Sequence, residues 1–272
     1  MTPMYETHWG LPQPAFRNVL DPRAYFAGSS QEEAIARLQF LVDQNWRLGL
    51  LTGEAGTGKS LLLQVLASSL RHRGVTVAQM GLRGLDAEEF LWRLAAGIGL
   101  NPDLAESPFS LWRNIDDQLA AFRYQLRPLV VIFDSFDAVT PGVAQLVSRL
   151  VHADDLPGLR LSVIVSGRPY QRPNPGRDLL QSADLRIDLT AWTQQETEEY
   201  VQRTLEQAGA TQPIFNSSAL ARLYDLSQGL PRRVNQLAEL ALLAGAGQEL
   251  EIIDAETIEG VFLELSFTDV AA

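Results

Sequence analysis

The chain has 272 residues, which is enough to bury one large core and a smaller companion domain. Hydrophobic residues make up 46% and charged residues 20%, which is typical of a globular protein rather than a disordered one. The absence of cysteine excludes a disulfide scaffold and a thiolate metal site, and a net charge of −11 argues against a general nucleic-acid coat.

No apolar run approaches the roughly 20 residues of a membrane helix. The N-terminus also lacks the basic cluster and apolar core of a signal peptide. We therefore expect a cytoplasmic chain with no membrane segment.

The first 30 residues are rich in proline and aromatic residues, which predicts an irregular segment at a domain edge. Apolar residues at helical spacing then predict a helix over Gln31–Gln44. Ser30 is its expected N-cap, and Glu33 stands where it would complete a capping box.

Strands and helices alternate through the next part of the chain, which predicts a parallel five-stranded sheet flanked by helices. The expected strands are Arg47–Thr52, Val75–Met80, Pro128–Asp134, Leu161–Ser166 and Leu185–Leu189. The expected helices between them are Leu61–Arg73, Asp86–Gly97, Leu111–Leu126 and Val143–Val151.

The pattern changes near Thr190, after which only helices are expected. They are Gln194–Ala208, Ser218–Ser227, Pro231–Ala244 and Ala255–Leu265. The sequence thus predicts an N-terminal segment (1–30), an α/β core domain (31–190) and a small all-helical domain (191–272).

A glycine-rich loop carries the clearest chemical signal. Gly53–Ser60 matches G-x-x-x-x-G-K-[ST] between a predicted strand and a predicted helix. Its backbone N–H groups would hold triphosphate oxygens, Lys59 would reach the β- and γ-phosphates, and the Ser60 hydroxyl would bind Mg²⁺. The expected nucleotide contacts are Gly53, Glu54, Ala55, Gly56, Thr57, Gly58, Lys59, Ser60 and Leu61.

The alternative, an ordinary glycine-rich turn, is disfavoured by this context and by the use of lysine. Lys59 is the sole lysine of the chain, and every other cation is an arginine. The sequence therefore predicts binding of ATP or a close relative. The absence of an Asn-Lys-x-Asp motif favours ATP over GTP.

Asp134 ends the strongly apolar third strand. A buried parallel strand delivers its last residue to the ligand crevice, so Asp134 is the expected metal-side partner of the loop. The alternative is an aspartate that caps the following turn.

Several segments resemble the ExeA/GspA-type AAA+ ATPases, the motor domains of secretion-assembly proteins, which are related to transposition-regulator ATPases. The distinguishing segments are the start, Met4–Leu11 with Pro14-Ala15-Phe16, and Gly229–Leu237, which is similar to the family's Gly-x-Pro-Arg segment. Leu50–Ser60 is similar to its phosphate loop, and Ser166–Pro169 stands where the family usually reads Gly-Gln-Pro.

The resemblance implies roles for two arginines and an assembly. Arg232 would be the sensor-2 arginine of a helical lid, and Arg186 would be an arginine finger, with a surface arginine and a strand-edge arginine as the respective alternatives. It also implies a homo-oligomer, as a ring or a filament, with a protein partner that the sequence does not identify.

Two positions depart from the family pattern. Ser135 follows Asp134 where the family has a glutamate that polarises the attacking water, and a serine hydroxyl is too weak a base to replace it. Asp137 would substitute only if the chain stayed extended, where residues two apart face the same way. Arg168 replaces the sensor-1 glutamine and would either touch the γ-phosphate or point to solvent.

These departures leave three functional hypotheses. The first is an ATPase with slow, switch-like hydrolysis, in which the catalytic set is Asp134, Ser135, Asp137, Arg186 and Arg232. The second is a nucleotide-dependent scaffold that does not hydrolyse. The third is a DNA-associated ATPase that uses the basic loop Arg168–Arg177, although composition favours a solvated loop there.

Overall fold

The computed structural model describes residues 4–16, 20–153, 157–169 and 176–270. They divide into two compact units, each with a hydrophobic core of its own. The sheet-bearing unit comprises Gln31–Ala55 and Lys59–Leu189. The helical unit comprises Met1–Ser30, Gly56–Gly58 and Thr190–Ala272.

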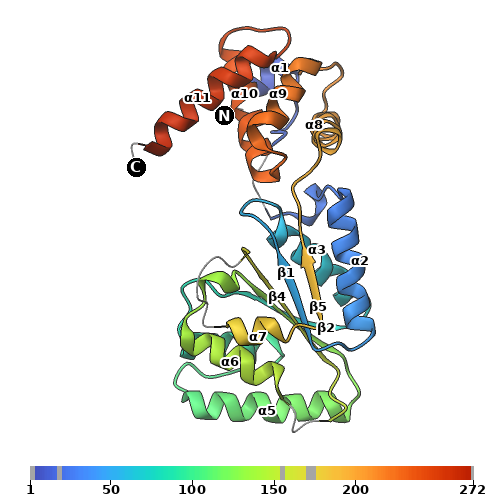
Figure 1. Cartoon of the computed structure of the whole chain (residues 1–272), viewed down its shortest axis with the longest axis vertical. Coiled ribbons are helices and arrows are strands. Elements are labelled where there is room, and N and C mark those ends of the chain that lie inside the picture. Colours follow the sequence, from blue (N-terminus) through green and yellow to red (C-terminus); the bar gives the residue numbers. More distant parts are fainter. Residues whose placement is uncertain (1–3, 17–19, 154–156, 170–175, 271–272) are drawn as a thin grey trace. The chain divides into compact units, whose positions relative to one another are not determined.

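A five-stranded parallel sheet forms the centre of the sheet-bearing unit (Figure 1). The strands are β1 (Leu48–Thr52), β2 (Thr76–Gly81), β3 (Leu129–Asp134), β4 (Leu161–Gly167) and β5 (Leu185–Asp188). Their order is β2-β3-β4-β1-β5, and every neighbouring pair is parallel. The predicted sheet is confirmed, and the carboxyl ends of all five strands meet at one edge, where such folds bind ligands.

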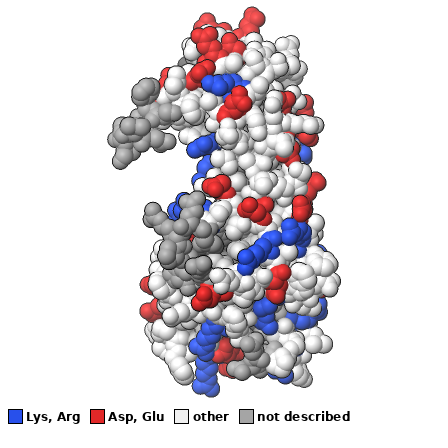
Figure 2. Space-filling model, in the orientation of Figure 1, with Lys and Arg blue, Asp and Glu red and all other residues white. Residues whose placement is uncertain are grey.

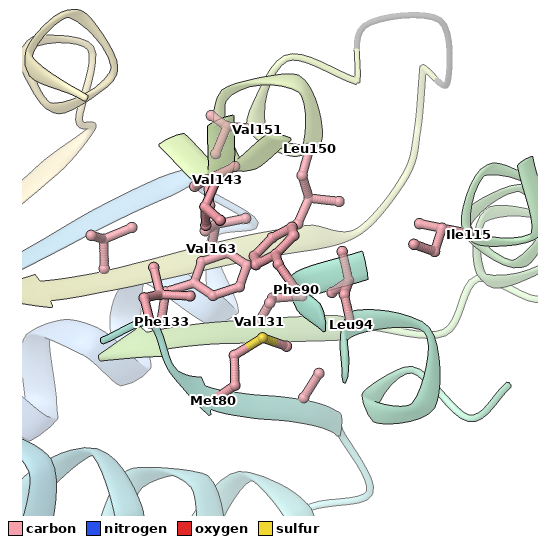
Figure 3. Close-up of a cluster of buried hydrophobic side chains, with 14 of the residues drawn as sticks. Met80, Phe90, Leu94, Ile115, Val131, Phe133, Val143, Leu150, Val151 and Val163 are labelled. Atoms are coloured by element: carbon pink, nitrogen blue, oxygen red, sulfur yellow. The ribbon is translucent and has the colours of Figure 1, made fainter. Parts of the chain in front are cut away.

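Helices cover both faces of this sheet. They are α2 (Ser29–Asp43), α3 (Lys59–His72), α4 (Ala87–Gly97), α5 (Pro108–Tyr124), α6 (Pro141–Val151) and the short α7 (Arg177–Gln181). Figure 1 shows α2 and α3 on the side away from α6 and α7. Residues from α4 to α7 pack with the strands in one core, where the rings of Phe90 and Phe133 contact each other at a tilt, with 5.5 Å between their centroids (Figure 3).

Gly49 in β1 allows α2 to pack closely against the sheet. A Cβ atom at this position would lie 2.6 Å from Cδ1 of Leu41 on α2. Glycine therefore lets the helix approach the strand more closely than any other residue would.

Two helices begin earlier than the apolar spacing predicts. α5 starts at Pro108 with Ser107 as N-cap, and α6 starts at Pro141 with Thr140 as N-cap. In both, the cap side chain accepts a backbone hydrogen bond and proline occupies the first turn, where its missing N–H has no cost. The caps, rather than the first apolar residue, set the start.

The expected capping box at Ser30 and Glu33 is wrong. α2 begins at Ser29, and the Ser30 hydroxyl instead accepts a hydrogen bond from the backbone N–H of Thr190. Glu33 pairs with Arg37 one turn along the helix, at 3.3 Å. The structure does contain a capping box, formed by Thr193 and Glu196 at the start of α8 (Gln194–Ala208) in the helical unit.

The prediction of an irregular segment over the first 30 residues misses two short helical elements. A short helix, α1 (Met4–Trp9), and a 3₁₀ turn, η1 (Pro22–Ala24), form there. The Tyr5 hydroxyl donates to Glu239 Oε1 at 2.5 Å, and Trp9 Nε1 donates to the Leu242 carbonyl at 2.9 Å. Six residues are too few to show a helical period in the sequence, so these long-range contacts hold the helix in place.

Four longer helices complete the helical unit, as predicted: α8 (Gln194–Ala208), α9 (Ser217–Ser227), α10 (Pro231–Gly247) and α11 (Ala255–Val270). Tyr5 and Trp9 contact α10, so the start of the chain packs within this unit. Across the described residues, every helix is too short or too polar to cross a membrane.

Gly229 lies at the break before α10, where no other residue fits. Its φ is +65°, and its carbonyl accepts a hydrogen bond from the Trp192 N–H at 2.9 Å. A Cβ atom there would lie 2.0 Å from the Trp192 carbonyl oxygen, which is a backbone atom that cannot swing away.

We predict that Gly229→Ala destabilises the protein by about 2–4 kcal/mol, because it adds a clash to a left-handed backbone. A thermal melt should show a loss of roughly 5–10 °C. Gly247→Ala is the matched control, since a Cβ atom at Gly247 meets nothing within 4 Å. Equal melting of the two variants would contradict this packing.

Candidate functional site

The glycine-rich loop joins β1 to α3 at the carboxyl edge of the sheet. Gly56 and Gly58 have φ angles of +92° and +91°, a region that favours glycine. α3 begins at Lys59, so the backbone N–H groups of its first turn lie at the end of the loop. A 14-residue helix that starts from such a loop provides backbone donors and a positive dipole end for an anion.

Lys59 lies folded over this loop. Its Nζ donates to the carbonyl oxygens of Gly53 and Glu54, both at 2.7 Å. Partial burial lowers the pKa of the Lys59 ammonium, while the attraction of Asp134, Asp137 and Glu54 opposes that shift. The ammonium therefore lies among carboxylates at the sheet edge.

The Asp134 carboxylate, at the end of β3, is held by three donors, two of them from α3 and β4. Its Oδ2 accepts from the Ser60 hydroxyl of α3 at 2.5 Å. Its Oδ1 accepts from the Ser135 N–H at 2.9 Å and from the Ser166 hydroxyl of β4. The fold thus brings together Ser60 and Asp134, which lie 74 residues apart in the chain.

Ser166 is a part of this cluster that the sequence analysis did not assign. It lies on β4, which separates β3 from β1 in the sheet, and its side chain is fully buried. The available signal was a hydroxyl near the carboxyl end of a largely apolar strand. Such a group needs a partner when it is buried, and Asp134 is that partner.

The chemistry of these side chains fits a magnesium ion. Hydroxyl and carboxylate oxygens are ligands that Mg²⁺ prefers, and Ser60 Oγ and Asp134 Oδ2 already lie next to each other. Mg²⁺ is also the ion that normally accompanies a nucleoside triphosphate at such a loop. Ser60 and Asp134 are therefore the residues that would hold it.

Ser135 has an uncommon backbone conformation. Its φ and ψ are 63° and 43°, in the left-handed region, and it leads directly into the 3₁₀ turn η2 (Phe136–Ala138). A non-glycine residue in this region carries a cost that functional sites often retain. Because the chain turns here, the extended arrangement that would align Asp137 with Ser135 does not occur.

Asp137 instead forms an ion pair with Arg168. Arg168 Nε lies 2.9 Å from Asp137 Oδ2, and the Arg168 N–H donates to Asp137 Oδ1 at 3.3 Å. Burial alone would raise the pKa of Asp137, but the two hydrogen bonds and the charge of Arg168 outweigh it, and the net shift is downward. The guanidinium of Arg168 thus has a protein partner that the sequence did not indicate.

Arg186 is engaged within the sheet-bearing unit. Its Nη2 donates to the carbonyl oxygens of Leu180 and Gln181, at 3.0 and 2.9 Å, where α7 ends. Arg232 is exposed at the second residue of α10 in the helical unit. Of the predicted basic loop Arg168–Arg177, residues 170–175 lie outside the described part of the chain.

Comparison with known proteins agrees with this geometry. Residues 42–173 match the model of a family described as an AAA domain. The chain is 29% identical over 245 residues to general secretion pathway protein A of Aeromonas hydrophila. The aligned region covers 89% of this chain and 45% of that protein. The chain thus spans about half the length of this curated relative.

Solved structures show the same fold at low sequence identity. A chain of Drosophila ORC bound to DNA superposes with a TM-score of 0.74 and 12% identity, over 96% of this chain and 66% of that one. ORC1 of Aeropyrum pernix in complex with DNA superposes with a TM-score of 0.66 and 16% identity, over 89% of this chain and 67% of that one. The branch migration motor RuvB of Thermotoga maritima superposes with a TM-score of 0.59 and 15% identity, over 93% of this chain and 74% of that one. The predicted AAA+ P-loop fold and the resemblance to the ExeA/GspA-type ATPases are confirmed.

The Arg168–Asp137 pair generates a pH-dependent prediction. We expect Asp137→Asn to lower the free energy of unfolding at pH 7 by up to about 1 kcal/mol, because Arg168 is partly exposed and the pair is screened. The folded-state pKa of Asp137 lies below its ordinary 3.8, so the pair stabilises the fold above that value. The difference from wild type should disappear as the pH falls through the lowered pKa.

Urea unfolding across this acidic range measures the effect. A double-mutant cycle with Arg168→Gln isolates the pair, since the second substitution should cost little once Asp137 is neutral. A difference that grows toward acid pH would show that the sign of the shift is wrong.

Proposed function

We propose that this chain, which carries the AAA+ fold and is similar to general secretion pathway protein A, binds ATP with Mg²⁺ and hydrolyses it slowly, as a nucleotide-dependent switch. The observation that carries the proposal is the cluster of Lys59, Ser60 and Asp134 at the carboxyl edge of the sheet. Ser135 stands beside it, where a carboxylate base is expected.

Each part of this cluster has a role in binding. The loop's backbone N–H groups and the start of α3 hold phosphate oxygens. The Lys59 ammonium exchanges its two carbonyl partners for the β- and γ-phosphates. Ser60 and Asp134 hold the metal side, and Ser166 fixes the Asp134 carboxylate in place. When bound, Mg²⁺ would offset the negative charge of the phosphates.

Slow hydrolysis follows from the groups next to Asp134. Ser135 is neutral and cannot take a proton from the attacking water near neutral pH. Asp137 is charged, but its lowered pKa and its bonds to Arg168 make it a weak base. A positioned general base contributes roughly 10²–10⁴-fold, so turnover without one falls well below the typical enzyme rate of ~10 s⁻¹.

The Arg168–Asp137 pair suits a switch. Both charges act on Lys59, so the guanidinium lies near the phosphate-binding ammonium. A γ-phosphate would compete with the Asp137 carboxylate for the guanidinium of Arg168. In the ADP state, which lacks this phosphate, Arg168 would pair with Asp137 again. The 3₁₀ turn η2, which carries Asp137, is the segment that this exchange would move.

Arg232 and Arg186 are expected to act in domain closure and in subunit assembly, respectively. We expect Arg232, in the first turn of α10, to meet the γ-phosphate as the helical domain closes over the core. Arg186 would act as a finger on a neighbouring subunit in a ring or filament. Its hydrogen bonds to the end of α7 favour the alternative for Arg186, a strand-edge arginine that holds β5 and α7 together.

Two alternatives remain, and each has its own discriminating result. A scaffold that binds ATP without hydrolysis is favoured by Ser135. A DNA-associated ATPase is suggested by the DNA-bound ORC structures. On the face shown in Figure 2, basic and acidic side chains of the described residues are interspersed rather than forming one basic surface. A salt-dependent titration with duplex DNA in the presence of ATP decides this point.

We predict measurable ATP turnover below about 0.1 s⁻¹, and none above background for Lys59→Ala. Steady-state phosphate release, measured beside equilibrium ATP binding, provides both readouts. Binding without any turnover above the Lys59→Ala variant would favour the scaffold, and absence of binding would remove the proposal altogether.

Ser135→Glu should raise turnover by about tenfold or more, because it restores a carboxylate next to Asp134. Ser135→Gln is the matched control, since both variants carry the same strain at a left-handed backbone and differ only in charge. An equal rate in the two variants would mean that position 135 is not where water is activated.

A further inference from the structure

A groove of about 440 Å³ lies on the sheet-bearing unit, where the start of α4 meets the segment before α5. It is lined by Asp86, Glu88, Glu89, Trp92, Arg93, Leu104, Glu106 and Leu111. None of these residues belongs to the phosphate loop or to the Asp134 cluster. The groove therefore needs an explanation of its own.

The rim of this groove is acidic. It carries four carboxylates and a single cation, Arg93, which is already paired with Glu89 at 2.6 Å. Asp86 caps α4, and Glu106 accepts hydrogen bonds from Asp103 and Asn114. The remaining negative charge attracts a cation and repels the phosphates of a nucleic acid.

The floor is apolar and contains an unused hydrogen-bond donor. Leu111 is buried and Trp92 is half-buried, while Leu104 beside them is 86% exposed. Phe109, two residues before Leu111, is 81% exposed. The Trp92 Nε1 atom is buried and lacks an acceptor among the described residues. A buried donor without a partner is costly, so a small rotation of the Trp92 ring that brings Nε1 to an acceptor supplied by an occupant is favoured.

We propose that this groove binds an extended peptide segment of a protein partner, in which an arginine or lysine is flanked by apolar residues. The cation would lie between the carboxylates and the Trp92 ring, and a peptide carbonyl would accept from Trp92 Nε1. The apolar neighbours would cover Leu104 and Phe109. The same unit already stacks an arginine on a tryptophan, with Arg149 4.1 Å from the Trp112 ring centroid.

Other occupants match fewer of these features. A free metal ion or polyamine would leave Trp92 Nε1 without an acceptor and the exposed leucine uncovered. An anionic ligand would meet the carboxylates. Because the groove is separate from the nucleotide cluster, the proposal does not rest on ATP hydrolysis.

The indole N–H signals of the full-length ¹⁵N-labelled protein provide a direct test, since the chain has 5 tryptophans. The probe is acetyl-Leu-Arg-Leu-Arg-Leu-amide, and the matched control replaces both arginines with glutamine. We expect one indole signal, identified by its absence from Trp92→Phe, to shift downfield and saturate with the arginine peptide. The glutamine peptide should bind at least about fivefold more weakly.

Glu88→Lys supplies the protein-side control, because no hydrogen bond or ion pair of the described residues engages Glu88. It should weaken the arginine peptide by about fivefold and leave the other indole signals in place. Three results would overturn the proposal. They are a Trp92 signal that does not move at millimolar peptide, an equal response to the two peptides, and a Trp92 signal that moves on dilution of the protein alone, which would mean that a second copy covers the groove.

Discussion

The hydrogen bonds of the Asp134 carboxylate are the constraint on which the site depends. One carboxylate joins the end of β3, the first turn of α3 and the end of β4 through Ser60, Ser166 and the Ser135 N–H. Because β4 lies between β3 and β1, this link ties the phosphate loop to the strand that would carry the metal. The carboxylate is partly buried at the end of an otherwise buried strand, so these donors satisfy its oxygens and also fix its orientation.

Much of the sheet-bearing fold could be predicted because its signals are local. Apolar strands that alternate with amphipathic helices indicate a parallel sheet, and a long run such as Leu129–Asp134 has few other interpretations. The failures have a common cause. The helix α1 depends on contacts between Tyr5 and Glu239, and Ser30 contacts Thr190 rather than its own helix. Partners so distant in the chain leave no periodic signal.

The candidate site likewise contains features with a local sequence signal and features that depend on residues distant in the chain. The loop of Lys59 is recognisable because its glycines and its cation stand at fixed spacing. The ion pair of Asp137 with Arg168 and the hydrogen bond of Ser166 to Asp134 were not predictable, since they depend on which strands become neighbours. The left-handed backbone of Ser135 was not predictable either, because a positive φ is uncommon for serine and the residue type does not indicate it.

The most direct test of the central claim is the dependence of ATP affinity on Mg²⁺ in wild type and in Asp134→Asn, measured by equilibrium titration. Asparagine keeps the shape of the side chain and removes its charge. The arrangement of Ser60 and Asp134 predicts that Mg²⁺ tightens ATP binding to the wild-type chain by about tenfold or more and has little effect on the variant. An equal gain from Mg²⁺ in both proteins would show that Asp134 does not hold the metal.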